Sequence, residues 1–219
     1  MSGGFDMRLV ADTISLSRGE RRLIAGLSFT VEAGEALVLT GPNGVGKTTL
    51  LRALAGFIPP DMGTIRLEGF GEDDSLVGEC AHYVGHANGV KPGLMVRENA
   101  QFWARFLKGD VRAVDDTLDM LHLADLAEVP AGYLSAGQKR RLGLTRLLLA
   151  KRPIWLLDEP TAALDVASQA LLAGLMQQHL DGGGMLIAAT HGPLGLNNAR
   201  ILELAAPDLS ELHVDGEVL

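Results

Sequence analysis

Short apolar runs alternate along this chain with longer amphipathic stretches. The runs at 36–40, 154–157 and 185–189 are almost continuously apolar, which is typical of parallel strands that are buried on both faces. Helical periodicity follows at 48–55 and at 168–179. Strands that alternate with helices predict a mainly parallel sheet covered on both faces, and therefore an α/β protein.

The rest of the chain follows two other patterns. Residues 7–39 are typical of short strands and turns, and the stretch 27–31 alternates like a half-buried strand. From about 96 to 150 the pattern is mostly helical, with helices expected at 98–107 and 111–121. We expect one domain, residues 1–219, with a helical insertion at about 92–150.

Composition narrows the classes of function. The 219 residues include 19 Lys and Arg against 27 Asp and Glu, a net charge of −8 that disfavours general binding to nucleic acid. The single cysteine, Cys80, fits a reducing compartment. No apolar run approaches the roughly 20 residues that span a bilayer, and residues 1–6 lack the features of a signal peptide. At a membrane, a partner would have to hold the protein.

The segment after the apolar run 36–40 fits the phosphate-loop pattern G-x-x-x-x-G-K-[ST]. Its glycines let the backbone curl around a phosphate, and the helix that follows adds the positive end of its dipole. We expect Lys47 to contact the β- and γ-phosphates of ATP and the Thr48 hydroxyl to ligate Mg²⁺. The expected nucleotide-binding residues here are Gly41, Pro42, Asn43, Gly44, Val45, Gly46, Lys47, Thr48 and Thr49.

Two acidic residues end the apolar run at 154–157. A parallel sheet opens onto its ligand at the carboxyl ends of its strands, so Asp158 is expected to hold Mg²⁺. Glu159 is expected to act as the general base that polarises the attacking water. Taken alone, the pair is better explained as the solvated end of an ordinary strand, and its place beside a phosphate loop favours the functional interpretation.

A third motif precedes an amphipathic helix. Small residues and a serine at a helix N-terminus suit an anion, although a serine-capped helix without a ligand is the alternative. The motif resembles the LSGGQ signature of the ABC ATPases, and with the two preceding motifs it makes the chain resemble that family. Its residues are Leu134, Ser135, Ala136, Gly137 and Gln138.

The resemblance implies a P-loop NTPase fold of the ABC-ATPase type, in which an antiparallel β layer accompanies the parallel core and the helical insertion. It also implies a head-to-tail homodimer, with each ATP between the phosphate loop of one copy and the signature motif of the other. Asp165 matches the D-loop that passes between the subunits. His191 matches the switch histidine at the γ-phosphate, although a lone histidine is more often structural.

The chain departs from the family pattern at two positions. Arg18 stands where many members stack an aromatic residue on adenine. A guanidinium plane can also stack, but a solvated arginine is the alternative. His86 takes the place of a glutamine after the strand that contains Tyr83. Imidazole is a poor ligand for Mg²⁺, so His86 is expected to contact the water network of the nucleotide or a membrane partner.

The neighbours of His86 and of His191 resemble one subfamily, the ATP-binding subunits of haem exporters in bacterial cytochrome c maturation. The matching stretches are 83–99, with Gly-x-Lys-Pro and Glu-Asn, and Thr-His-Gly-Pro-Leu at 190–194. This resemblance implies an integral membrane subunit and other cytochrome c maturation proteins as partners, and a peripheral position on the cytoplasmic face of the inner membrane.

Several alternatives stay open at this point. The chain could serve another ABC exporter, or it could be a soluble ABC protein acting on ribosomes or DNA. No Cys-x-x-Cys-His occurs and the six histidines show no ligand spacing, so no haem site is expected in the chain itself. The resemblance also leaves open whether haem is moved or a haem-loaded chaperone is released.

Overall fold

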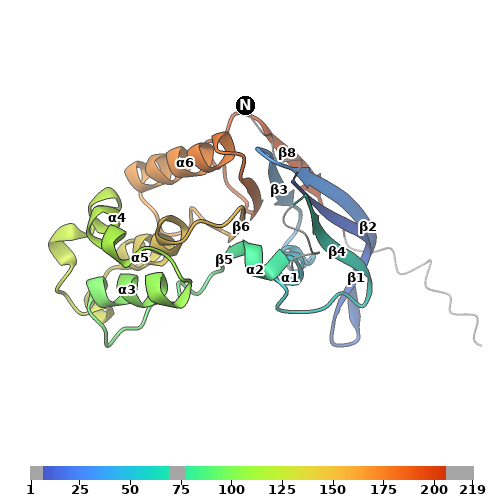
Figure 1. Cartoon of the computed structure of the whole chain (residues 1–219). Helices are drawn as coiled ribbons and strands as arrows, with labels where there is room; N and C mark the ends of the chain where they lie inside the picture. Colours follow the sequence, from blue (N-terminus) through green and yellow to red (C-terminus); the bar gives the residue numbers. More distant parts are fainter. Residues whose placement is uncertain (1–6, 70–76, 206–219) are drawn as a thin grey trace, which may run out of the picture.

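The computed structural model describes residues 7–69 and 77–205; residues 1–6, where no signal peptide is expected, lie outside the described residues. A sheet of five strands stands at the centre, and every neighbouring pair in it is parallel. The helices of residues 96–149 and 166–181 lie on one side of it, and a second sheet lies on the other (Figure 1). In spatial order the strands are β5 (Ala81–Val84), β6 (Ile154–Asp158), β7 (Met185–Ala189), β3 (Ala36–Thr40) and β8 (Ala199–Glu203).

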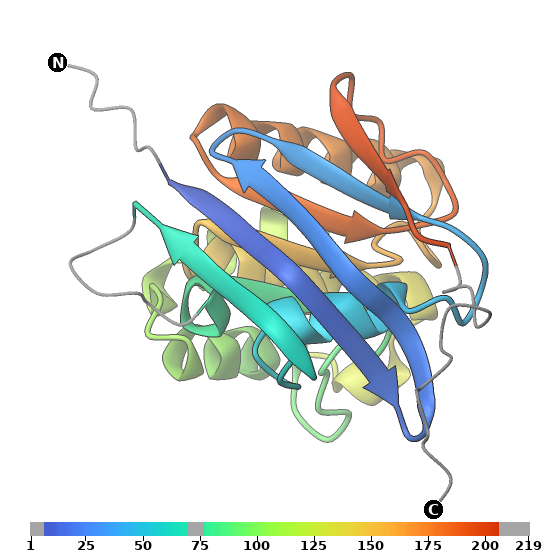
Figure 2. The same ribbon diagram turned by 90° about the vertical axis from the view of Figure 1, so that its right-hand side faces the viewer.

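The second sheet is the expected antiparallel layer. It has the order β2-β1-β4, with β1 at Arg8–Arg18, β2 at Arg21–Glu32 and β4 at Met62–Glu68. Figure 2 looks onto this sheet, which lies in front of α1 (Lys47–Leu54). The strands β1 and β2 are longer than expected from sequence, because β1 keeps its pairing through three irregularities of register that break the simple alternation.

The parallel strands send successive side chains to opposite faces, which explains why their sequences are continuously apolar. Leu156 and Ile187 belong to the core cluster between the two sheets, together with the buried leucines of α1. Leu157 and Leu186 belong to the cluster on the other face. The sheet is therefore covered on both faces, as the sequence pattern predicts.

The helices on the second face share one core with the sheet. They are α3 (Val96–Phe106), α4 (Val114–Met120), α5 (Ala136–Leu149) and α6 (Val166–Asp181). The helix expected at 111–121 divides into a 3-10 turn, Val111–Ala113, followed by α4. The reason is local, because the Asp110 side chain accepts a hydrogen bond from the Arg112 amide and caps the tighter turn. Among the described residues, no helix is both long and apolar enough to traverse a bilayer.

Asn99 joins α3 to the segment that precedes it. Only 1% of this residue is exposed. Its Oδ1 accepts a hydrogen bond from the Lys91 amide at 2.8 Å, and its Nδ2 donates to the carbonyl oxygens of Lys91, Leu94 and Met95 at 3.0 to 3.2 Å. One amide side chain thereby fixes the turn that leads from β5 into the helices.

We predict that Asn99→Ala lowers the free energy of unfolding by about 2–3 kcal/mol, because it removes all four hydrogen bonds of a buried side chain and leaves the Lys91 amide without its acceptor. Urea unfolding of the two proteins measures the difference. The exposed Arg105 on the same helix supplies the control, and Arg105→Ala should change stability by less than about 0.5 kcal/mol. A loss for Asn99→Ala as small as that of the control would contradict the prediction.

Candidate functional site

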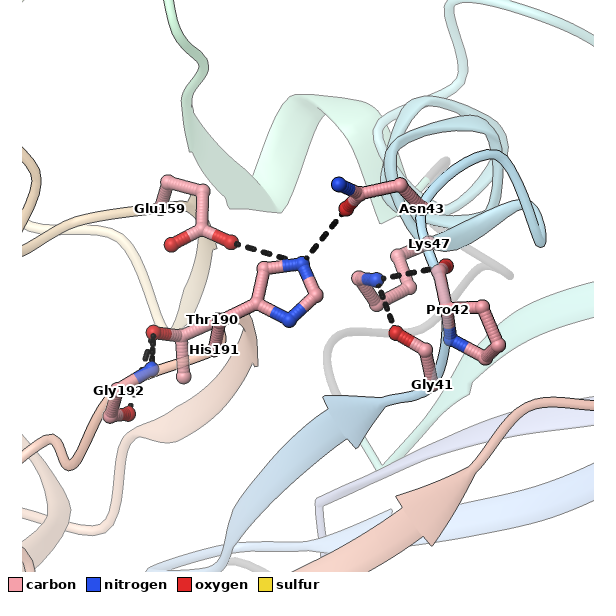
Figure 3. Close-up of polar contacts among 8 residues, drawn as sticks. All are labelled: Gly41, Pro42, Asn43, Lys47, Glu159, Thr190, His191 and Gly192. Carbon is pink, nitrogen blue, oxygen red and sulfur yellow. Dashed lines mark hydrogen bonds and ion pairs between the residues drawn. The ribbon is translucent and has the colours of Figure 1, made fainter.

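The loops that follow β3, β6 and β7 meet at one edge of the central sheet. These strands are parallel neighbours in the order β6-β7-β3, so their carboxyl ends lie side by side. Lys47 begins α1 at the end of the loop after β3, Glu159 follows β6 directly, and the loop after β7 contains His191. Figure 3 shows that these three expected site residues do come together.

The loop after β3 curls around the side chain of its own lysine. Gly41, Gly44 and Gly46 have φ values of 127°, 78° and 120°, a region in which side chains are strained. A Cβ atom at Gly41 would lie 2.3 Å from the carbonyl oxygen of Leu204. Lys47 is 8% exposed, and its ammonium donates to the carbonyl oxygens of Gly41 at 2.6 Å and Pro42 at 3.0 Å (Figure 3). A cation is thus held inside the loop, as phosphate binding requires.

His191 links the loop to the acidic end of β6. Its Nε2 lies 2.8 Å from Oδ1 of Asn43 and 3.8 Å from Oε1 of Glu159. The hydrogen bond to Asn43 needs a proton on Nε2, and the contact with Glu159 becomes an ion pair when the imidazole is fully protonated. The side chains of His191 and Glu159 are 53% and 33% exposed, so both can reach a ligand at this edge.

Glu159 has an unusual main-chain conformation, with a φ of 47°. Its amide donates to the carbonyl oxygen of Ala189 at 2.8 Å, which continues the pairing of β6 with β7 by one residue. A left-handed conformation is costly for a residue with a side chain and persists where neighbouring groups hold it. The Glu159 carboxylate is therefore directed by a turn that the surroundings maintain.

Asp158 ends β6 and is 7% exposed. The hydroxyl of Tyr83 on β5 lies 3.5 Å from Oδ2 of Asp158, a long contact. Burial, together with the negative charge of Asp158, raises the pKa of Tyr83, and Arg52 opposes that shift. Asp158 and Thr48 offer a carboxylate and a hydroxyl oxygen, the type of ligand that Mg²⁺ prefers, so the residues present fit that ion.

Arg140 belongs to this edge as well, although no motif in the sequence assigns it a role. It follows Lys139 and precedes Arg141 on α5, and an amphipathic reading assigns such a basic run to solvent. In the structure it is 3% exposed. Its guanidinium donates to the carbonyl oxygens of Gly85 (2.8 Å), Asp158 (3.0 Å), Glu159 (2.8 Å) and Pro160 (3.2 Å) and to Oδ1 of Asn88 (3.1 Å). Burial lowers the pKa of Arg140, and the charges of Asp158 and Glu159 oppose that effect.

The signature segment lies at the start of α5. Ser135 caps this helix in a reciprocal arrangement: its Oγ accepts from the Gln138 amide at 3.2 Å, and Gln138 Oε1 accepts from the Ser135 amide at 2.8 Å. A Cβ atom at Gly137 would lie 2.8 Å from the carbonyl oxygen of Ala163. The segment therefore borders the stretch that leads to Asp165, which caps α6 through the Ser168 amide.

The signature helix and the helix of the phosphate loop cover different faces of the sheet. The leucines of α1 belong to the cluster between the sheets, and those of α5 to the cluster on the other face. Arg18 is exposed at the end of β1, where it pairs with Arg21 across a tight hairpin turn. His86 is exposed in the loop after β5.

A family profile described as "ABC transporter" matches residues 24–162, more than half of the chain. The match spans the phosphate loop, the signature segment and the acidic end of β6. The chain belongs to the ABC transporter family. This assignment confirms the family resemblance and the fold class expected from the motifs, and an ABC ATPase domain binds and hydrolyses ATP.

Curated relatives narrow the place of the chain within the ABC family. The Cytochrome c biogenesis ATP-binding export protein CcmA of Rhizobium meliloti (strain 1021) is 50% identical over 202 residues, which cover 90% of this chain and 98% of that protein. The protein of the same name from Rhodopseudomonas palustris (strain BisB5) is 54% identical over 179 residues, which cover 82% and 89%. Both alignments extend over most of the two chains.

The fold is that of solved ABC cassettes. The dimeric structure of a post-hydrolysis state of the ATP-binding cassette MJ0796 bound to ADP and Pi aligns with a TM-score of 0.77. The two sequences are 22% identical, and the alignment covers 90% of this chain and 94% of that one. At this identity the likeness concerns the fold alone.

We predict that Lys47→Ala lowers the affinity for ATP by at least about tenfold, because it removes the buried cation from the phosphate loop. Titration calorimetry with ATP measures the change. Lys151 is exposed and precedes β6, at the end of that strand opposite to Glu159, so Lys151→Ala supplies a control with the same change of charge. Equal affinities for the two variants would contradict the role of Lys47.

Proposed function

We propose that this chain is the ATP-binding and ATP-hydrolysing subunit of the haem exporter in cytochrome c biogenesis. The observation that carries the proposal is the meeting of Lys47, His191 and Glu159 at one edge of the sheet. The relatives support its biological setting, because the two proteins compared above are named as ATP-binding export proteins of cytochrome c biogenesis.

The phosphate loop would hold the β- and γ-phosphates of ATP. Lys47 would exchange the carbonyl oxygens of Gly41 and Pro42 for phosphate oxygens, a stronger charge-assisted contact. Thr48 and Asp158 would hold Mg²⁺, which would neutralise charge on the phosphate oxygens when bound. The exposed Arg18 would lie against the adenine.

Glu159 would accept a proton from the attacking water, and its turn directs the carboxylate toward the side of His191 (Figure 3). His191 would donate a hydrogen bond to the γ-phosphate from the nitrogen that now contacts Asn43. Both side chains keep an exposed portion, so the reacting groups could reach them. Positioning and charge neutralisation then supply most of the catalysis, as in phosphoryl transfer generally.

Two copies of the chain would complete each site. Ser135 and its neighbours begin α5, a helix of 14 residues whose start offers amide groups to an anion. Because α5 and α1 cover different faces of the sheet, the signature segment of one copy is free to serve the phosphate loop of another. Asp165 would lie at the contact between the copies.

The membrane partner would be an integral subunit of the exporter, with this chain held peripherally at the cytoplasmic face of the inner membrane. His86 would face that partner or the water network of the nucleotide, since it is exposed in the loop after β5. Imidazole is a poor ligand for a hard cation, so His86 would not bind Mg²⁺.

We predict that Glu159→Gln keeps ATP binding but slows hydrolysis by at least about a hundredfold, because an amide cannot accept the proton. In cells that lack their own subunit, the wild-type chain should restore the yield of holocytochrome c and Glu159→Gln should not. Phosphate release and haem-stained cytochrome yield are the two measurements.

The matched control for this test is Glu128→Gln, which removes a carboxylate from a surface ion pair with Arg97 and should leave both readouts near wild type. Wild-type hydrolysis by Glu159→Gln would reject Glu159 as the base. A wild-type chain that hydrolyses ATP without raising the cytochrome yield would reject the assignment to cytochrome c biogenesis.

The shared site predicts complementation between two inactive variants. Ser135→Arg and Lys47→Ala should each abolish hydrolysis as homodimers. A mixed dimer has one intact site and one site that is broken twice, so an equal mixture should recover about a quarter of the wild-type rate. Mixed dimers verified by two affinity tags that remain inert would contradict a head-to-tail dimer.

A further inference from the structure

The guanidinium of Arg140 joins two separate loops at the catalytic edge of the sheet. One is the segment 158–160 at the end of β6, whose three carbonyl oxygens accept hydrogen bonds from Nη2 and Nε. The other is the loop 85–89 after β5, in which Gly85 O and Asn88 Oδ1 accept from Nη1. These contacts account for all three nitrogens of a side chain that is 3% exposed.

The bond to Glu159 acts on a strained residue. Its amide donates to Ala189, and its carbonyl oxygen accepts from Arg140 at 2.8 Å and from the Ala162 amide at 3.2 Å, so the peptide groups on both sides of the positive φ are held. A left-handed turn of this kind relaxes when the groups that hold it are removed. The direction of the Glu159 carboxylate therefore depends on Arg140, although no contact between the two side chains is needed.

The loop 85–89 is fixed to α5 a second time by Arg146. This side chain donates to the carbonyl oxygen of Asn88, and its guanidinium stacks over the ring of Trp103 on α3 at 4.3 Å from the centroid. Burial lowers the pKa of Arg146 to about 10, so it stays charged at neutral pH. Two arginines of α5 therefore act on these loops. Arg146 binds only the loop 85–89, which contains His86, whereas Arg140 binds both that loop and the segment 158–160.

We propose that Arg140 is a positioning residue for ATP hydrolysis, which sets the direction of Glu159 and couples it to the loop that contains His86. The proposal rests on the proposed function, in which Glu159 is the general base. The guanidinium that binds the loop 85–89 also binds the Glu159 carbonyl oxygen. A movement of that loop therefore displaces the guanidinium and changes the position of the segment 158–160, and the reverse also holds.

Only arginine has the geometry for this role. Its planar fork presents five donors in fixed directions, whereas a lysine presents three donors from one nitrogen and a glutamine presents two. A lysine would keep the charge but could not bridge the two loops with several bonds at once. The conservative variant therefore separates the effect of charge from the effect of shape.

The test compares steady-state hydrolysis by the full-length chain, extracted with its membrane partner, for wild type, Arg140→Gln and Arg140→Lys. We expect kcat to fall by about tenfold or more in both variants. The KM for ATP should change by less than about threefold, because the phosphate loop itself is untouched. A purely structural role would instead lower the amount of active protein and leave kcat per ATP-binding site unchanged.

Arg152→Gln is the matched control. Arg152 donates to the carbonyl oxygens of Gly78 and Ala81. It precedes β6, and Ala81 begins β5, so these main-chain contacts lie at the amino ends of the two strands whose carboxyl ends Arg140 joins. Its kcat should stay within about twofold of wild type. Equal losses of kcat in the Arg140 and Arg152 variants would overturn the positioning role.

A double-mutant cycle tests whether Arg140 acts through Glu159. In the Glu159→Gln background, Arg140→Gln should cause no further loss of the single-turnover rate, and an undiminished tenfold loss would overturn the proposal. If Arg140→Gln fails to fold, Arg140→Lys and Asn88→Ala carry the same cycle.

The single-turnover rates also separate a failure of the proposed function from a failure of the role of Arg140. A wild-type rate no higher than that of Glu159→Gln contradicts the proposed function. A wild-type rate well above it but equal to that of Arg140→Lys contradicts only the role of Arg140.

Discussion

Parallel pairing of β6, β7 and β3 is the constraint on which the rest of this structure depends. It places the carboxyl ends of the three strands at one edge, so residues separated by more than a hundred positions, such as Asn43 and His191, come within hydrogen-bond distance. A parallel sheet must also be covered on both faces. The antiparallel sheet with α1 covers one face, and the helices α3 to α6 cover the other.

The edge of the sheet at which Lys47 and Glu159 meet holds its cations with main-chain oxygens. Lys47 is bound by two carbonyl groups of its own loop, and Arg140 by four carbonyl groups and one side-chain amide. Carbonyl groups satisfy the hydrogen-bond donors of a buried cation but do not neutralise its charge. The positive charge can therefore still attract a phosphate or the carboxylates nearby. Within the described residues, every buried side-chain nitrogen and oxygen has a hydrogen-bond partner.

The loop 85–89 stands between this edge and the helices. Trp103 on α3 donates to the carbonyl oxygen of Gly89, and Arg146 on α5 bonds the carbonyl of Asn88. Through Arg140 the same loop reaches the turn at Glu159. A contiguous set of packed and hydrogen-bonded groups thus runs from α3 to Glu159, the proposed general base, and His86 lies exposed beside it.

The sequence by itself determined the parallel core, because three apolar runs and the glycine pattern of the phosphate loop depend on local spacing alone. It also determined the residues of the loop and the acidic pair, since their chemistry follows from residue type and from their place after a strand. The antiparallel layer was expected from the family resemblance, while the extent of β1 and β2 was decided by long-range pairing through irregular register. Tertiary structure alone decided that Arg140, in a basic run typical of a solvated helix face, is buried. Its acceptors are mostly main-chain carbonyl groups of distant loops, and carbonyl groups carry no residue identity that a sequence pattern could reveal.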